Sequence, residues 1–181
     1  MTVLGDRKIL KEIKSKSIVI EPFDLECLGS NSYDVHLGKT LSIYQDDVLD
    51  AARPPKSKFI EIPQEGYVLH PNELYLGATM EYTESHKYLP WIDGKSSVGR
   101  LGIFIHATAG RGDVGFMGHF TLEIMVVKSV RVYAGMPIGQ LTYMRTTKID
   151  RPYNKKKTAK YNNRDPRPMP SRMWLNFNKK D

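Results

Sequence analysis

The chain of 181 residues is 40% hydrophobic and 26% charged, an ordinary composition for one globular domain with its own core. Its formal net charge of +7 is concentrated in residues 145–181, which hold 12 Lys or Arg and only 3 Asp. The single cysteine, Cys27, excludes an internal disulfide, and the sequence shows neither an apolar run of about 18 residues nor a signal-peptide core. We therefore expect a cytoplasmic protein without a membrane partner.

One helix and then a succession of short strands are predicted along the chain. The helix covers residues 6–17, where Asp6 is expected to cap its start and Ile9, Leu10 and Ile13 share one face. Runs rich in β-branched and aromatic residues, separated by turn residues, predict strands at residues 16–23, 32–45, 58–63, 67–83, 102–109, 119–127 and 138–144. Many short strands at this spacing predict a mainly β fold, a sandwich or a barrel, rather than a doubly wound α/β sheet.

The basic segment at residues 145–181 is predicted to be an arm attached to a β core of residues 1–144, the two forming a single domain over residues 1–181. Its charge suits nucleic acid, a phosphorylated small molecule or plain solvent. The segment is not of low complexity, because "RPYN", "AKY" and "PSRMWLNF" place aromatic residues and prolines among the charges. Aromatic residues at this density indicate a segment that packs against something.

The stretch "DGKSSVGR" is the first candidate for binding chemistry. A short helix predicted at residues 97–101 would bring backbone N–H groups, the hydroxyls of Ser96 and Ser97, and the guanidinium of Arg100 to one point. Such a point favours a phosphate, because unpaired amides attract an anion and Arg can grip it through two hydrogen bonds. The same residues also suit a capped helix with a solvent-exposed Arg, and the glycine spacing of a P-loop is missing.

Two carboxylates are candidates for chemistry in the strand-rich region. In "HFTLEIMVV", strand alternation places Leu122 and Ile124 on one face and Glu123 on the other, which is also largely apolar. A partly buried carboxylate can exchange protons near neutral pH, although a Glu at a solvated strand edge fits the pattern as well. Asp113, in the turn "AGRGDVGF", is explained equally well by turn chemistry, and His106 by a place in the core or an interface.

Long blocks of the sequence resemble the dCTP deaminase family, the deaminating branch of the trimeric dUTPase superfamily. They are "DGKSSVGRLG", "HATAGRGDVGFMGHFTLE" and "RPYNKKKTAKY", flanked by "NSYDVHLG" and "PSRMWLNF", so the resemblance covers nearly the whole chain. It implies a dUTPase-type fold, a distorted, jelly-roll-like β-barrel with a short N-terminal helix and a C-terminal arm that closes over the nucleotide. It also implies a homotrimer with active sites shared between subunits.

The same resemblance implies which residues of the core surround the nucleotide. The serine–arginine block would hold the triphosphate through Lys95, Ser96, Ser97 and Arg100. Asp113 would bind the deoxyribose 3′-hydroxyl. Thr121 and Leu122 would read the base through their backbone groups, beside Glu123 as the proton shuttle.

The arm and one turn complete the implied site. Tyr153 and Lys160 would close over the nucleotide from a neighbouring subunit, and Arg164 stands near the place of a base-contacting Gln of the family. Gly112 and Val114 stand where the family commonly has Ile and Pro around the aspartate. We therefore expect a looser turn there.

The expected reaction is metal-independent hydrolysis of dCTP to dUTP and ammonia. Zinc-dependent cytidine deaminases need a His or Cys with a paired Cys motif, which one cysteine and five scattered histidines do not supply. Glu123 would act as general acid and base on a water held by Ser96 and by backbone groups near Ala109, with Arg100 as the third catalytic residue. Mg²⁺ would bind through the triphosphate oxygens.

Other functions stay open on sequence grounds. The serine–arginine block and Asp113 would serve equally well in a dUTPase, or in a bifunctional enzyme that converts dCTP to dUMP and pyrophosphate. A non-catalytic binder of nucleotides or nucleic acid is a further class, disfavoured by the intact Glu123. We expect dCTP and dUTP as partners, dTTP as a candidate inhibitor, and no nucleic acid.

Overall fold

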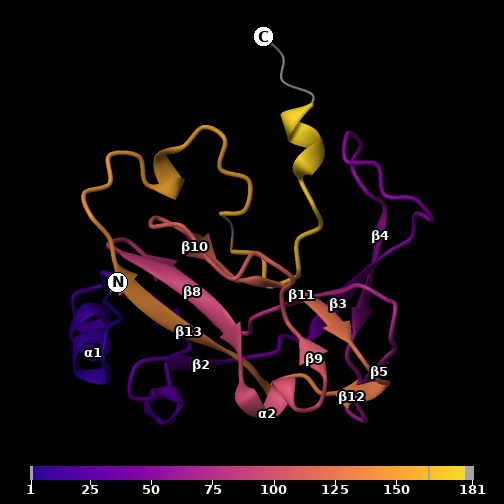
Figure 1. Cartoon of the computed structure of the whole chain (residues 1–181), viewed down its shortest axis with the longest axis horizontal. Coiled ribbons are helices and arrows are strands. Elements are labelled where there is room, and N and C mark those ends of the chain that lie inside the picture. The colour runs from indigo at the N-terminus through magenta and orange to yellow at the C-terminus, as the bar shows by residue number, and fades with distance from the viewer. Residues whose placement is uncertain (1, 163, 178–181) are drawn as a thin grey trace.

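Figure 1 shows the computed structural model of the chain, which describes residues 2–162 and 164–177. Its helical elements are α1 (Asp6–Lys14), α2 (Ser96–Gly99) and the 3-10 helices η1 (Leu25–Cys27), η2 (Tyr153–Lys155) and η3 (Met173–Asn176). Its strands are β1 (Ile18–Glu21), β2 (Tyr33–His36), β3 (Thr40–Tyr44), β4 (Ser57–Glu61), β5 (Tyr67–Leu69), β6 (Tyr75–Ala78), β7 (Tyr82–Ser85), β8 (Tyr88–Gly94), β9 (Ile103–Phe104), β10 (Met117–Gly118), β11 (Thr121–Val126), β12 (Val130–Val132) and β13 (Pro137–Arg145). Among the described residues, no helix is long and apolar enough to cross a bilayer.

The strands pair in antiparallel fashion and form four sheets around a shared core. The sheet orders are β1-β7-β10, β4-β3-β6-β11-β9, β12-β5 and β2-β13-β8. Buried aliphatic and aromatic side chains from all four sheets make up that core. The mainly β prediction is confirmed. After β13 the chain continues as the arm, of which residues 163 and 178–181 lie outside the described part.

The N-terminal helix α1 is shorter than predicted and begins differently. It ends at Lys14, and Lys16 then takes a positive φ of 55°, through which an α-helix does not continue. The preceding glycine occupies the N-cap position, so the predicted capping role of Asp6 is wrong. The predicted apolar face is confirmed for two of its three residues, because Ile9 is fully buried in the core and Ile13 packs against it, whereas Leu10 is half-buried and belongs to neither group.

The strands differ from the sequence prediction in several places. The runs at 32–45 and 67–83 divide into β2 and β3 and into β5, β6 and β7, and β10 and β12 were not predicted. The strand expected at residues 102–109 is reduced to β9, because the chain beyond it turns away to line a cavity. Strand β8 was not predicted, since Pro90 and Gly94 interrupt its apolar pattern. A proline cannot donate to a sheet ladder, and it is accepted here because β8 is the edge strand of its sheet.

Strand β11 follows the predicted alternation. Leu122, Ile124 and Val126 are buried in the core. Thr121 and Glu123 point the other way and line a cavity. The side-chain period of two therefore places the candidate proton shuttle opposite the core.

Two buried tyrosines provide a matched stability test. Tyr33 and Tyr143 are each 1% exposed. The Tyr33 hydroxyl accepts a hydrogen bond from the N–H of Asp24 at 2.8 Å, whereas the Tyr143 hydroxyl has no hydrogen-bond partner in the described part of the chain. Because an unpaired buried hydroxyl costs about 1–3 kcal/mol, Tyr143→Phe is expected to raise the free energy of unfolding by about 1 kcal/mol, and Tyr33→Phe to lower it by about as much. Urea denaturation measures both; an equal loss in the two variants would contradict the assignment.

Candidate active site

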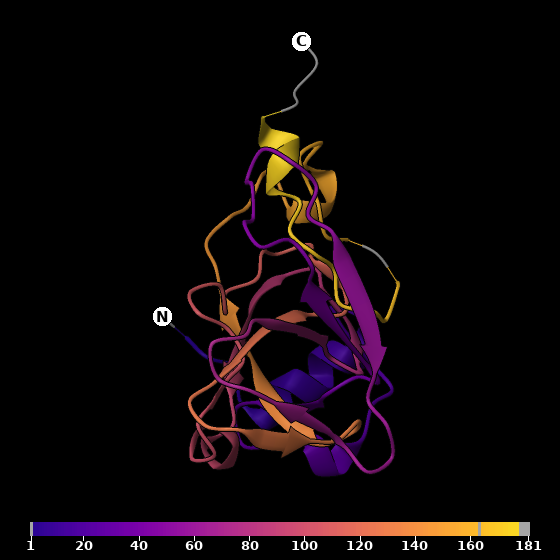
Figure 2. The same ribbon diagram turned by 90° about the vertical axis from the view of Figure 1, so that its right-hand side faces the viewer.

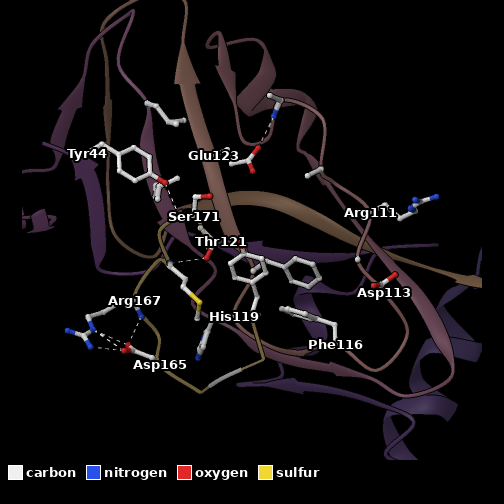
Figure 3. A pocket seen from close by; sticks show the side chains of 18 of the residues that line it. Tyr44, Arg111, Asp113, Phe116, His119, Thr121, Glu123, Asp165, Arg167 and Ser171 are labelled. Atoms are coloured by element: carbon white, nitrogen blue, oxygen red, sulfur yellow. Dashed lines mark hydrogen bonds and ion pairs between the residues drawn. The ribbon is translucent and has the colours of Figure 1, made fainter. Parts of the chain in front are cut away.

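A cavity of about 850 Å³ lies where β11 meets the C-terminal arm (Figure 3). Ligand sites commonly measure about 300–1,000 Å³, so this cavity is large enough for a nucleotide. Its walls come from β3, β6 and β11, from the loop between β9 and β10, and from the arm. Five of the predicted nucleotide-binding residues line it: Ala109, Asp113, Thr121, Glu123 and Tyr153.

Glu123 is held at the cavity wall by its strand and by the loop after β9. Its N–H donates to the carbonyl of Ile105 at 2.8 Å, and its Oε2 accepts from the N–H of Ala107 at 3.4 Å. The side chain is half-buried, and the apolar side chains of Leu76 and Met125 line the same cavity. Within residues 2–162 and 164–177 no other group binds this carboxylate, so it is available to a water or a ligand.

The loop between β9 and β10 carries Asp113 to the cavity because it pairs only briefly with β8. The N–H of Ile92 donates to the carbonyl of Gly110, and the N–H of Gly112 donates to the carbonyl of Pro90, both at 2.8 Å. Pro90 has no N–H with which to extend this pairing, so the chain turns away after Gly112. A Cβ at Gly112 would lie 2.9 Å from the Pro90 ring. This turn is tightly packed, and the looser turn expected there is not what the structure shows.

The first part of the arm docks on the turn that holds Asp113. The N–H of Tyr153 donates to the carbonyl of Val114 at 2.7 Å, and the Lys156 Nζ lies 3.2 Å from the Asp113 carboxylate. Gly115 has a φ of +89°, and a Cβ there would lie 2.9 Å from the Tyr153 nitrogen, so a glycine is required for this approach. Tyr153 thus lines the cavity of its own chain, whereas the resemblance implied that it reaches a neighbouring subunit.

Residues 165–171 form a second arm segment at the cavity. The side chains of Asp165 and Arg167 line the cavity and pair with each other. Arg167 donates three hydrogen bonds of 2.6–3.2 Å to the carboxylate, and these hold the pKa of Asp165 at about 2. The Arg167 guanidinium also lies over the ring of Phe59 in β4, 5.0 Å from its centroid. The segment therefore contacts the largest sheet through the Arg167 guanidinium, which packs on the Phe59 ring of that sheet.

The predicted phosphate-binding helix forms, but it lies outside this cavity. α2 begins at Ser96 and ends at Gly99, close to the predicted range. Ser96, Ser97 and Arg100 are exposed, and none of them lines the cavity. In Figure 1 and Figure 2, α2 lies at the bottom of the molecule and the arm at the top. A single chain therefore does not bring the predicted phosphate residues and Glu123 into one cavity.

Lys95, the first residue of the predicted phosphate block, is occupied by an ion pair. Its Nζ donates to the carboxylate of Asp34 in β2. The same carboxylate accepts a hydrogen bond from Nε2 of Gln140 at 2.9 Å. A phosphate would have to compete with Asp34 for the lysine.

Three further predicted residues also lie outside the cavity lining. Leu122 is buried in the core, so only its backbone can reach a ligand. Lys160 is half-buried within the arm. The Arg164 guanidinium lies 4.6 Å from the centroid of the Tyr82 ring and 3.7 Å from the Glu84 carboxylate. Arg164 thus holds the arm to β7 in this structure rather than meeting the cavity.

The sequence analysis missed several residues that line the cavity. Phe116 and Phe120 pack with their ring centroids 4.6 Å apart and form an aromatic wall. Arg111 adds a cation in the loop, where its backbone forms a β-bridge with Trp91. His119 also lines the cavity. The aromatic residues of "VGFMGHF" and the Arg of "GRGD" are the signals that could have identified them.

The described residues do not form a metal-binding cluster of their own. No group of three or more His, Cys, Asp or Glu side chains within them could hold a metal ion. The three carboxylates that line the cavity, those of Asp113, Glu123 and Asp165, lie on separate walls (Figure 3). This donor set does not fit a Mg²⁺ ion bound by protein side chains alone, and it is compatible with one that arrives on the phosphates of a ligand.

The antiparallel sheets and the nucleotide-sized cavity with its available carboxylate define a mainly β domain with the features of a small-molecule site. A family model described as dCTP deaminase-like matches residues 3–146. The chain belongs to this dCTP deaminase-like family, as its sequence blocks indicated.

Relatives agree with this family, and a solved structure has a similar fold. A protein of Clostridium acetobutylicum named "dCTP deaminase, dUMP-forming" is 48% identical over 156 residues, 86% of this chain and 88% of the relative. One of Clostridium beijerinckii with the same name is 44% identical over 177 residues, 98% of this chain and 99% of the relative. The crystal structure of 2′-deoxycytidine 5′-triphosphate deaminase from Agrobacterium tumefaciens matches 80% of this chain with a TM-score of 0.63 and 20% identity, which supports the fold. The chain spans 48% of the length of that solved chain.

Proposed function

We propose that the protein converts dCTP to dUMP, with release of ammonia and pyrophosphate and consumption of two water molecules. The observation that carries this proposal is the half-buried Glu123 carboxylate on the wall of a nucleotide-sized cavity, where the Ala107 N–H is its one hydrogen-bond partner among the described residues. The printed names of the relatives, "dUMP-forming", favour this bifunctional alternative over the release of dUTP that the sequence analysis put first.

The deamination step is assigned to Glu123. Its carboxylate would take a proton from the water that attacks C4 of cytosine and deliver that proton to N3, after which ammonia leaves from the tetrahedral intermediate. The N–H of Ala107 at 3.4 Å orients the carboxylate, and Ala109 lines the cavity beside it. General-base catalysis supplies only about 10²–10⁴-fold. Orientation and electrostatic preorganisation of the cavity must supply the rest.

The deoxyribose is assigned to the loop between β9 and β10, on the wall of the cavity. Asp113 would bind the 3′-hydroxyl in place of the Lys156 ammonium that it now contacts. A Mg²⁺ ion that enters with the triphosphate would supply neutralisation of the phosphate charge, and no cluster of described side chains would hold it directly.

We also propose that active sites are completed by a second copy of the chain in a homotrimer. Ser96, Ser97 and Arg100 are exposed and lie apart from the cavity that holds Glu123. These three side chains do not reach the cavity of their own chain, but they are exposed and could bind the phosphates of a nucleotide in the cavity of a neighbouring chain. The exposed side chains of Phe104 and Val127, close to α2, are apolar groups that contact with a neighbour would bury.

The reaction is tested by its products. The protein is incubated with dCTP and Mg²⁺, and dUTP, dUMP, pyrophosphate and ammonia are resolved over time. We expect dUMP, pyrophosphate and ammonia in equal amounts, with little free dUTP. Stoichiometric dUTP without pyrophosphate would show a deaminase alone, and no turnover of dCTP would overturn the proposal.

A further inference from the structure

We propose that residues 165–171, here called the wall segment, form a preorganised wall of the cavity, and that Thr121 and Tyr44 are the positioning residues that fix it beside Glu123. The inference rests on the proposed function, because it takes dCTP as the ligand of the cavity. It adds two hydroxyl groups of the β core to the determinants of substrate binding.

The wall segment has a restricted backbone before any ligand binds. Its sequence, "DPRPMPS", places a proline at every second position. Each proline has a fixed φ, and each residue that precedes one is confined to extended conformations. The four residues that alternate with the prolines all line the cavity: Asp165, Arg167, Met169 and Ser171. Pro168 is buried, so the segment is packed onto the protein rather than suspended over it.

Three of the four N–H groups of the wall segment donate to side chains. The N–H of Met169 donates to Oγ1 of Thr121 at 3.1 Å. The N–H of Ser171 donates to the hydroxyl of Tyr44 at 3.0 Å. The N–H of Arg167 donates to the neighbouring aspartate at 3.0 Å. Because prolines prevent a continuous strand ladder, the hydroxyls of Thr121 and Tyr44 are the acceptors through which the β core binds the backbone of the wall segment.

The two core hydroxyls fix the wall segment next to the proposed catalytic group. Thr121 and Glu123 lie two residues apart on the same face of β11, and both line the cavity. Figure 3 shows the hydrogen bonds from the wall segment to Thr121 and to Tyr44 on the side of the cavity where Glu123 lies. A wall segment released from these hydroxyls would widen the cavity there without altering the carboxylate. We therefore expect weaker dCTP binding with little change in the chemical step.

The test compares three variants of the full-length protein: Thr121→Val, Tyr44→Phe and the double variant. Each substitution removes one acceptor and keeps the size and shape of the side chain. Each single variant is expected to raise the KM for dCTP by about three- to tenfold, and the double variant by more, with kcat changed by less than about twofold. Thr121→Ser, which restores the hydroxyl, is expected to return KM to the wild-type value. Tyr67→Phe, which removes a tyrosine hydroxyl outside the cavity lining, is the matched control.

A second measurement reports the position of the wall segment and does not depend on enzyme activity. Trp174 follows the segment and lines a smaller cavity of about 240 Å³ that Tyr44 and Ser171 also line. In a Trp91→Phe background it is the only tryptophan of the chain. Quenching of its fluorescence by acrylamide is expected to increase in the double variant and to stay unchanged in the Tyr67→Phe control.

The two readouts separate the possible outcomes. An increase in both KM and quenching supports the proposal. Unchanged quenching in the double variant overturns it, whether or not KM rises, because the hydroxyls would then not act through the wall segment. Increased quenching with an unchanged KM overturns the assigned role in substrate binding. A wild-type protein that does not form dUMP from dCTP would overturn the proposed function, while the quenching comparison would still decide the anchoring.

Discussion

The variant Glu123→Gln is expected to lose measurable release of ammonia from dCTP while it keeps dCTP affinity within about tenfold of the wild type. Gln has nearly the size and shape of Glu, so it fits the same place on β11. Its amide does not accept the proton of the attacking water, and the general-base step therefore fails. Ammonia release and dCTP binding, followed by calorimetry, are the two measurements.

Glu61→Gln provides the control for this experiment. Glu61 is exposed in β4 and does not line the cavity, so the same chemical change there should leave turnover and binding as in the wild type. Substantial ammonia release by Glu123→Gln would remove Glu123 from the mechanism. A loss of dCTP binding as large as the loss of turnover would show that the residue acts on affinity rather than on the proton.

Mixing two inactive variants is expected to restore activity if the sites are shared between subunits. Arg100→Ala removes the guanidinium of α2, and Glu123→Gln removes the proton acceptor of the cavity. Each homotrimer alone should be nearly inactive. In trimers reassembled at random from equal amounts, about a quarter of the sites would combine an intact Glu123 with an intact Arg100 from its neighbour. Recovery of about that fraction of wild-type activity is the expected result.

Subunit exchange must be shown independently for this result to count. Native mass spectrometry of differently tagged chains would report mixed trimers, and light scattering the oligomeric state. Mixed trimers without recovered activity would show that each chain supplies its own Arg100. An active monomer at assay concentration would contradict the proposed trimer as well as the shared site.

The sequence predicts those features of this molecule that depend on residues close together in the chain, such as a strand face, a short helix or a turn. The alternation of apolar residues around Glu123 predicts its strand and its face, because a side-chain period of two follows directly from strand geometry. The short helix predicted at 97–101 is likewise a local feature, and the structure places it at Ser96–Gly99. The turn that carries Asp113 was located by its glycines, although its tight packing against Pro90 depends on a strand that the pattern did not show.

The composition of the cavity depends on contacts between distant parts of the chain, which no local pattern contains. Met169 and Thr121 are 48 positions apart, and Ser171 and Tyr44 are 127 apart. The ion pair of Lys95 requires β2, β13 and β8 to lie side by side. The proline alternation of the wall segment is visible in the sequence, but its acceptors are not.

The position of Pro90 also bears on how this protein avoids aggregation. An exposed edge strand offers free N–H and C=O groups on which a strand from another molecule can add. On the outer edge of β8, the N–H of Ile92 and the carbonyl of Pro90 already form hydrogen bonds, to Gly110 and to Gly112. These two groups are therefore not available to a strand from another molecule. The proline itself presents no donor to an incoming strand. Pro90, which prevented β8 from being predicted, therefore also makes it less favourable for a strand of a second molecule to extend the sheet at that edge.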